Sequence, residues 1–162
     1  RRGNIDGAAG EGLVADFGSL GAWVWDSGAW TQISGTHPDY LIAADVDGAG
    51  GDDIVGDFGS TGLWLWSGGA WTQLSGVNAD YLISADTDGD GSAEILADFG
   101  AIGLWLWNSG TWSQLSGVNP EFLFALDYEP DGRKEIMTDF GLLGLWLWDD
   151  GAWSQLSALN PD

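Results

Sequence analysis

The stretch ADFGAIGLWLW, residues 97–107, decides the fold of this chain because three close variants of it occur elsewhere in the sequence. The variants ADFGSLGAWVW, GDFGSTGLWLW and TDFGLLGLWLW begin at residues 15, 56 and 138, so the spacing is 41 residues each time. A fixed period of this length is typical of stacked-repeat proteins. We therefore predict a single repeat domain over residues 1–162. Its units are 13–53, 54–94, 95–135 and an incomplete 136–162, with 1–12 the remnant of a preceding acidic loop.

Each repeat predicts four short strands. In the third repeat they fall at 95–99, 103–107, 111–116 and 122–127, where aromatic and aliphatic residues lie between Gly, Asn and Pro. In LWLW the Leu side chains point to one face of a sheet and the Trp side chains to the other, so both faces require burial. This pattern predicts an all-β fold, a β-propeller of four 41-residue and mostly four-stranded blades. A β-solenoid-like repeat array is the alternative.

The strand before the acidic loop has a clear sequence pattern only at 40–45, 81–86 and 122–127. We therefore expect the first blade to lack this strand. Open edges of apolar strands recruit partners. We expect self-association, with the last blade of one copy meeting the first blade of the next, or continuation into further repeats of the same array.

The composition is strongly acidic, with 4 Lys and Arg against 25 Asp and Glu and a formal net charge of −21. Such a charge repels nucleic acid and anionic membrane surfaces and attracts cations. The chain is 44% hydrophobic and has 12 Trp, so it has enough apolar surface for a packed core. No apolar run is long enough to span a membrane. We therefore expect neither a nucleic-acid partner nor membrane insertion.

Acidic residues recur at alternate positions in equivalent nine-residue loops, such as DTDGDGSAE at 86–94. Calcium takes six to eight oxygen ligands, which alternate residues of a tight turn can supply together with a backbone carbonyl and a closing carboxylate. The loop at 4–12 keeps only Asn4 and Asp6 and is expected to be weak or empty. The predicted Ca²⁺ ligands in the other three loops are Asp45, Asp47, Asp53, Asp86, Asp88, Asp90, Ser92, Glu94, Asp127, Glu129, Asp131, Arg133 and Glu135. The structural alternative is that acidic turn residues only cap hairpins.

The segment YLISADTDGDGSAEILADFG, residues 81–100, resembles the calcium-loop repeats called FG-GAP in integrin α-chains and VCBS in bacterial surface proteins. The resemblance covers all four repeats and is most convincing from residue 40 onward. It implies a β-propeller with structural calcium, an extracellular or cell-surface location, and a role in adhesion, recognition or scaffold assembly with surface proteins as partners. The sequence departs from the family pattern at Glu94 and Glu135, which stand at the closing position of their loops.

No arrangement of catalytic residues is evident. The DFG triplets occur at four equivalent turns without the other kinase motifs, so their Asp residues are predicted to cap turns. The single His, His37, has Asn at its equivalent positions and is interpreted as a loop substitution. We therefore predict a protein that is not an enzyme. A glycoside hydrolase that uses paired carboxylates is a less favoured alternative.

The repeated Trp residues allow two interpretations. Trp64, Trp66 and Trp71, with their counterparts, can form the core between blades. Exposed Trp side chains can instead stack on sugar rings, which would make the chain a multivalent lectin that binds glycans. The residues predicted to bind such a ligand lie beside Gly-containing turns and are Trp71, Trp112 and Trp153.

Overall fold

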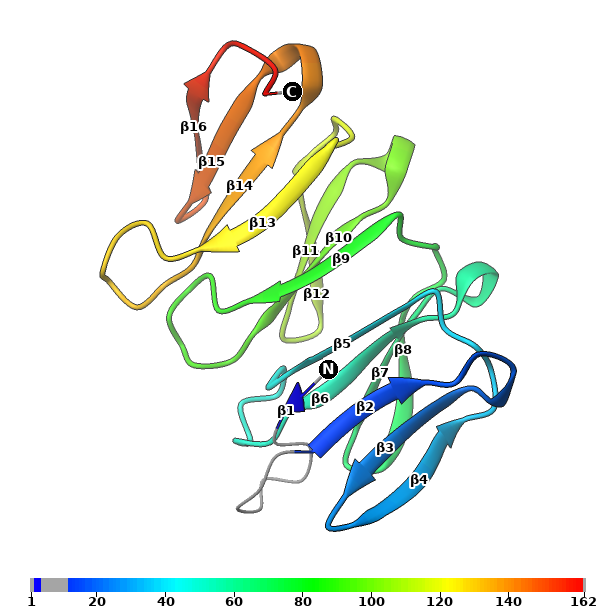
Figure 1. The fold of residues 1–162 in the computed structure, drawn as a ribbon. Helices are drawn as coiled ribbons and strands as arrows, with labels where there is room; N and C mark the ends of the chain where they lie inside the picture. Colours follow the sequence, from blue (N-terminus) through cyan, green and yellow to red (C-terminus); the bar gives the residue numbers. More distant parts are fainter. Residues whose placement is uncertain (1, 4–11, 162) are drawn as a thin grey trace. The chain divides into compact units, whose positions relative to one another are not determined.

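The computed structural model describes residues 2–3 and 12–161. These residues form four antiparallel sheets of four strands, which we call blades 1 to 4 (Figure 1). Blade 1 is β1 (Arg2–Gly3), β2 (Gly12–Asp16), β3 (Ala22–Asp26) and β4 (Ala29–Ser34). Blade 2 is β5 (Tyr40–Ala44), β6 (Asp53–Asp57), β7 (Leu63–Ser67) and β8 (Ala70–Ser75). Blade 3 is β9 (Tyr81–Ala85), β10 (Glu94–Asp98), β11 (Leu104–Asn108) and β12 (Thr111–Ser116). Blade 4 is β13 (Phe122–Leu126), β14 (Glu135–Asp139), β15 (Leu145–Asp149) and β16 (Ala152–Ser157).

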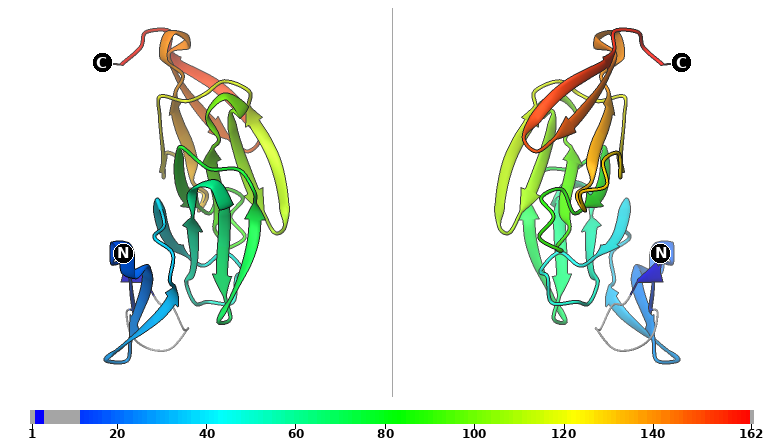
Figure 2. Two further views of the ribbon diagram at one scale, coloured as in Figure 1. Left: turned by 90° about the vertical axis from the view of Figure 1, so that its right-hand side faces the viewer. Right: turned by 90° about the vertical axis from the view of Figure 1, so that its left-hand side faces the viewer.

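The all-β prediction is confirmed, since both views of Figure 2 show strands joined by turns and loops. The strands lie in each sheet in chain order. The four strands predicted for the third repeat agree with β10, β11, β12 and β13 to within one residue at each end. The acidic loop joins the first two strands of a blade, and a short 3-10 turn joins the second and third. The blades thus begin at the strand before the acidic loop, so their boundaries are shifted from those of the predicted repeat units.

The expectation that blade 1 lacks its first strand is wrong. Strand β1 pairs with β2, with Arg2 opposite Leu13 and Gly3 opposite Gly12. The pairing uses backbone groups of only two residues, which carry none of the aliphatic or aromatic pattern found in β5, β9 and β13. A strand of this kind has no periodicity from which it could be recognised.

The chain divides into two compact units, Arg1–Leu82 and Ile83–Asp162. Unit 1 holds blades 1 and 2, and unit 2 holds blades 3 and 4, with the boundary inside β9. Among the described residues no helix is long and apolar enough to cross a membrane.

Each unit has its core between its two blades. In unit 1, Val14 and Val24 of blade 1 pack with Ile54, Trp66 and Trp71 of blade 2. The core of unit 2 has the same construction, with Leu104 and Leu106 of blade 3 against Trp148 and Trp153 of blade 4. The aliphatic face of one blade therefore packs against the Trp face of the next blade, as the alternation in LWLW predicts.

The DFG turns are capped by their own Asp side chains. In each turn Asp Oδ1 accepts a hydrogen bond of 2.8–2.9 Å from the N–H of the Gly two residues later. A second Gly ends the turn and must be Gly: Gly62 has φ +79°, and a Cβ there would lie 2.1 Å from the Ser75 carbonyl oxygen. The prediction that the four DFG aspartates cap turns is confirmed, and the capped turn fixes the position of the Phe beside it.

Candidate ligand pockets and acidic loops

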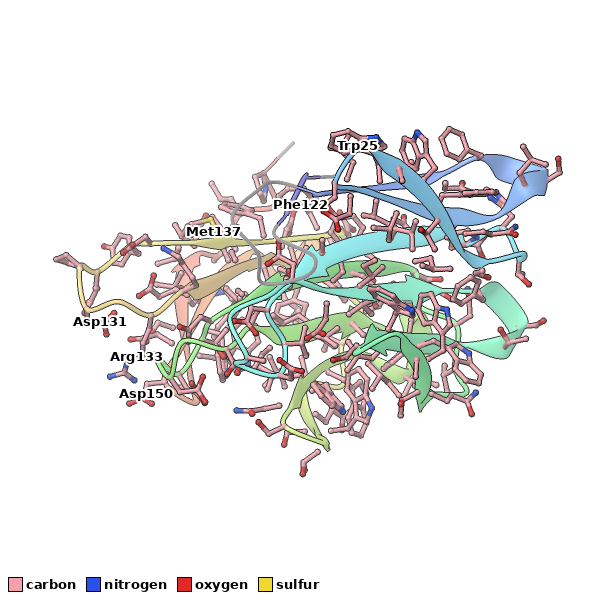
Figure 3. The ribbon with its side chains drawn as sticks, turned by 90° about the horizontal axis from the view of Figure 1, so that it is seen from below. Trp25, Phe122, Asp131, Arg133, Met137 and Asp150 are labelled. Carbon is pink, nitrogen blue, oxygen red and sulfur yellow. The ribbon has the colours of Figure 1, made fainter. Side chains whose placement is uncertain are left out.

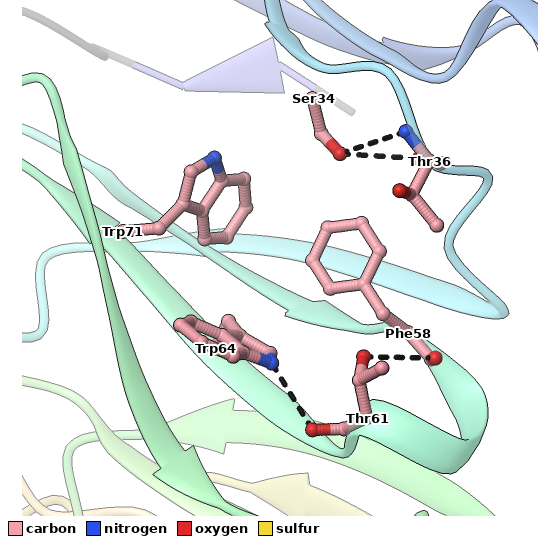
Figure 4. Close-up of a pocket in the computed structure, with 6 residues that line it drawn as sticks. All are labelled: Ser34, Thr36, Phe58, Thr61, Trp64 and Trp71. Atoms are coloured by element: carbon pink, nitrogen blue, oxygen red, sulfur yellow. Dashed lines mark hydrogen bonds between the residues drawn. The ribbon is translucent and has the colours of Figure 1, made fainter.

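Unit 1 contains an open pocket of about 280 Å³ between the end of blade 1 and the outer part of blade 2 (Figure 4). Its volume lies just below the range of drug-sized ligand sites, so it suits one sugar-sized ring better than an extended ligand. The pocket is mostly apolar, with hydroxyl groups contributed by both blades. Its lining residues are Ser34, Thr36, Phe58, Thr61, Trp64 and Trp71.

Both indole rings of this pocket are held by hydrogen bonds inside the protein. Trp71 Nε1 donates to the Ile33 carbonyl oxygen at 2.7 Å, and its ring meets Phe58 edge to face at 5.3 Å. Trp64 Nε1 donates to the Thr61 carbonyl oxygen at 3.1 Å, which also accepts from Gln73 Nε2 at 2.9 Å. Because both indole N–H groups are satisfied, the rings are fixed and offer their apolar surfaces to a ligand.

Unit 2 contains an equivalent pocket of about 210 Å³ between blades 3 and 4. Trp153 Nε1 donates to the Leu115 carbonyl oxygen at 3.0 Å, and Trp146 Nε1 donates to the Leu143 carbonyl oxygen at 2.9 Å. Phe140 again meets Trp153 at 5.3 Å. The lining residues are Leu115, Ser116, Val118, Phe140, Leu143, Trp146 and Trp153.

The two pockets differ in the chemistry of two equivalent positions. Thr36 and Thr61 line the pocket of unit 1, whereas Val118 and Leu143 stand at these positions in unit 2. The Thr61 hydroxyl donates to the Phe58 carbonyl oxygen at 3.1 Å, so its lone pairs remain able to accept from a ligand. The pocket of unit 1 can therefore hydrogen-bond a polar ligand at places where the other offers only hydrocarbon.

The Trp residues that were predicted to bind a ligand are half-buried. Trp71 and Trp153 fit both interpretations, core packing and ligand binding, because each packs against a core and also lines a pocket. Trp112 makes the corresponding edge-to-face contact with Phe99, at 5.4 Å. The sequence did not indicate that Phe58 and Phe140 also line the pockets, although the fixed Phe of each DFG triplet was the feature that could have shown it.

The loop at 45–53 brings Asp45, Asp47 and Asp53 together, with one oxygen of each within 4.8 Å of the others. Asp53 is buried, and its Oδ2 accepts from the backbone N–H groups of Val46 and Asp47 at 3.0 and 3.1 Å. Burial raises the pKa of Asp53. Asp45 Oδ1 is buried and has no hydrogen-bond partner within the described part of the chain. The cluster therefore offers unneutralised carboxylate oxygens to a hard cation.

The loop at 86–94 repeats this arrangement with Asp86, Asp88 and Glu94. Glu94 is buried, and its Oε2 accepts from the backbone N–H and the hydroxyl of Thr87, at 2.7 and 2.6 Å. Burial raises the pKa of Glu94 as well. Asp90 is exposed and lies outside the three-carboxylate cluster, and its Oδ1 accepts from the N–H of Ser92 at 2.8 Å.

The loop at 127–135 contains positive charges of its own. Lys134 Nζ lies 2.8 Å from Asp127 Oδ2, and Arg133 contacts Asp131 at 3.2 Å and Asp150 at 2.9 Å (Figure 3). Glu135 is buried, and its Oε2 accepts from the N–H of Tyr128 at 2.6 Å. Glu129, the remaining predicted ligand, is exposed. Asp127 and Asp131 are thus neutralised by side chains of the same loop rather than left open.

Two further sequence predictions concern residues near the N-terminus. Asn4 and Asp6 of the first acidic loop lie outside the described residues. His37 Nδ1 lies 2.8 Å from Asp16 Oδ2, so this loop residue contacts the Asp of the first DFG turn. In blade 2 the equivalent oxygen, Asp57 Oδ2, accepts from the N–H of Ala79. The residue equivalent to Ala79 one repeat earlier is Pro38, which has no N–H to donate.

Four-stranded antiparallel blades with alternating aliphatic and Trp faces define this chain as a protein of the β-propeller type. A solved structure with this fold is a lectin of Agrocybe aegerita, described as specifically recognising non-reducing terminal N-acetylglucosamine. It matches with a TM-score of 0.66 and 19% identity over 99% of this chain. The chain corresponds to half the length of that lectin. No protein-family model and no characterised protein sequence matches the chain.

Proposed function

We propose that this chain is a carbohydrate-binding protein that holds one sugar ring in each aromatic pocket between blades. The observation that carries the proposal is the pocket of Phe58, Trp64 and Trp71, where both indole N–H groups are already bonded within the protein. An apolar wall with a few polar groups at its rim suits a sugar, which has apolar C–H faces and hydroxyl groups at its edge. The fold shared with a lectin supports the same class of ligand.

N-Acetylglucosamine is the sugar to test first. It is the ligand that the similar lectin is described as recognising, and its acetamido methyl group can lie against an aromatic ring while its hydroxyls face Thr36 and Thr61. We propose that binding occurs without turnover, as expected of a lectin. Incubation with N-acetylglucosamine oligomers should then leave them intact, and release of monosaccharide would contradict this part of the proposal.

The test is calorimetric titration of the chain with N-acetylglucosamine. Trp64→Ala should weaken binding at the pocket of unit 1 at least tenfold, because the ring forms one of its walls. Phe122→Ala is the matched control, since Phe122 is an exposed aromatic residue outside both pockets. Thr61→Ala is a milder second variant that leaves the aromatic rings in place. Absence of binding by the unmodified chain, or an equal effect of Phe122→Ala, would refute the proposed site.

A second proposed property is calcium-dependent stability, in keeping with the resemblance to FG-GAP and VCBS repeats. Its support is the pair of carboxylate clusters, Asp45–Asp47–Asp53 and Asp86–Asp88–Glu94, together with the unpartnered oxygen of Asp45. Oxygen ligands at this spacing suit Ca²⁺ better than Mg²⁺, which retains more of its water. With a sugar pocket on the same blades, this combination suits an extracellular module for adhesion or recognition of glycans on surfaces.

A further inference from the structure

Within each unit, the pocket of one blade is completed by the blade before it. Trp71 of blade 2 donates to the carbonyl oxygen of Ile33, and Trp153 of blade 4 donates to that of Leu115; in both cases the acceptor lies 38 residues earlier. The preceding blade also supplies the Ser-containing turn, Ser34–Thr36 or Ser116–Val118. A complete pocket therefore consists of an aromatic half from one blade and a turn half from the preceding blade.

Blade 1 carries a preformed aromatic half. Phe17 meets Trp30 edge to face at 5.2 Å, and Leu20 offers a carbonyl oxygen that accepts from Trp23 Nε1 at 2.9 Å and Gln32 Nε2 at 2.8 Å. These contacts match those of Phe58, Trp71, Trp64 and Gln73. However, Phe17 is 48% and Trp30 is 44% exposed, whereas Phe58 and Trp71 are half-buried. Within residues 2–3 and 12–161, the N–H of the Trp30 indole has no acceptor.

Blade 4 carries a preformed turn half. Ser157 Oγ accepts from the N–H of Leu159 at 3.0 Å and donates to its carbonyl oxygen at 3.3 Å, as Ser34 does with Thr36. Leu156 and Leu159 are 46% and 78% exposed, whereas Ile33 and Leu115, the counterparts of Leu156, are half-buried. The turn half thus has its backbone geometry in place and its apolar side chains uncovered.

We propose that a second copy of this chain joins these two halves, with Trp30 of one copy on Leu156–Leu159 of the other and its indole N–H donating to the Leu156 carbonyl oxygen. The segment QLSALN (155–160) closely repeats QLSGVN (114–119), which contains the acceptor of Trp153. Each copy has one half of each kind, so the contact is heterologous and two copies can satisfy both. The similar lectin is twice as long as the matched region, which is the length of two copies.

Each such contact creates a further aromatic pocket whose walls come from two chains. Its walls would be Phe17, Leu20, Trp23 and Trp30 from one copy and Ser157 and Leu159 from the other. That this pocket takes a sugar rests on the proposed function, whereas the association itself does not. Because each copy has a formal charge of −21, association should tighten as salt screens the repulsion; the Debye length is about 10 Å at 0.1 M salt.

Sedimentation velocity of the full chain over a range of concentrations, without sugar, tests the association. The unmodified chain should form a dimer, and Trp30→Ala or Leu159→Asp should each raise the dissociation constant at least tenfold. Leu142→Asp is the matched control, because Leu142 is 95% exposed on the same blade and its counterpart Ser60 lines no part of the pocket of unit 1. Far-UV circular dichroism of each variant checks that the strands are retained.

A mixture of the Trp30→Ala and Leu159→Asp chains provides the sharper test. The first variant retains an intact turn half and the second an intact aromatic half. The mixture should therefore form a 1:1 dimer through one intact contact, at concentrations where each variant alone is monomeric. A monomeric unmodified chain at all concentrations, or a mixture that stays monomeric, would overturn the proposal. Sugar titration of the dimer is a separate readout, so failure to bind sugar would refute the proposed function and leave the association standing.

Discussion

The indole N–H of Trp71 donates to the carbonyl oxygen of Ile33 across 2.7 Å, which links two blades through one side chain. Removal of this donor in Trp71→Phe leaves the Ile33 carbonyl without its partner, and we expect a loss of about 1–3 kcal/mol in the free energy of unfolding. Denaturant unfolding at high dilution measures this. Trp30→Phe is the control, because the Trp30 N–H has no acceptor in the described chain; an equal loss in both variants would contradict the role of the bond.

The chemical difference between the two pockets predicts different sugar affinities. Replacing Thr36 by Val and Thr61 by Leu gives the pocket of unit 1 the side chains of unit 2. Loss of hydrogen bonds to sugar hydroxyls should weaken binding there by about twofold to tenfold. Calorimetry against N-acetylglucosamine measures the change, with Thr72→Val as a control at an exposed position outside the pocket. Unchanged affinity would show that the threonine hydroxyls do not contact the sugar.

Calcium is expected to raise the melting temperature through the loops at 45–53 and 86–94. Binding to the folded state alone stabilises by about 2.7 kcal/mol when free calcium is 100 times its dissociation constant. Replacing Asp86 and Asp88 together by Ala should reduce the difference between melting in calcium and melting in chelator. The difference is the quantity to compare, because Asp86 also accepts from Gly89 and Gly91.

The matched variant for the calcium experiment is Asp127→Ala with Lys134→Ala, which removes an acidic residue together with its own cation. We expect this variant to keep most of the calcium-induced rise in melting temperature. If chelator leaves the melting curve of the unmodified chain unchanged, the calcium proposal is wrong. If both double variants lose the rise equally, the loop at 127–135 binds the ion as well.

The buried side chain of Asp57 leads us to expect a free energy of unfolding that depends on pH independently of the acidic loops. Its side chain is fully buried, and burial raises its pKa in the folded state. The stability associated with its protonation is fully present below the unfolded pKa of about 3.9 and is lost as pH rises through the folded pKa. In chelator, the unfolding free energy of the unmodified chain minus that of Asp57→Asn should increase as pH falls from neutrality toward that unfolded value. A difference independent of pH would contradict the prediction.

The sequence predicted those parts of the fold that depend on local pattern. The period of 41 residues, the alternation in LWLW and the Gly and Asp of the turns specify β10 to β13 closely, because side-chain direction and turn geometry are local properties. The sequence could not predict β1, since two paired residues have no pattern. It also could not resolve whether Trp71 is core or ligand-binding, because the same side chain packs against the core cluster of unit 1 and also lines the pocket.

The acidic loops illustrate a different limit of prediction from sequence. The regular spacing of Asp and Glu predicts that the three loops are alike, and the backbone does place similar residues at similar positions. Whether a carboxylate remains open depends on long side chains whose direction is not fixed by spacing, such as Lys134 beside Asp127. The difference between Thr61 and Leu143 is visible in the sequence, but its meaning required knowing that both positions line a pocket.

The bond from Trp71 to Ile33 also has a consequence for the number of binding sites. Each described pocket lies within one unit and needs two successive blades, so a contact of the proposed kind between two copies adds a pocket that neither copy has alone. The proposed association would therefore increase the number of binding sites as well as bury exposed apolar side chains such as Trp30 and Leu159. For weak individual sites on a shared scaffold, each added site strengthens attachment to a multivalent surface without any new kind of contact.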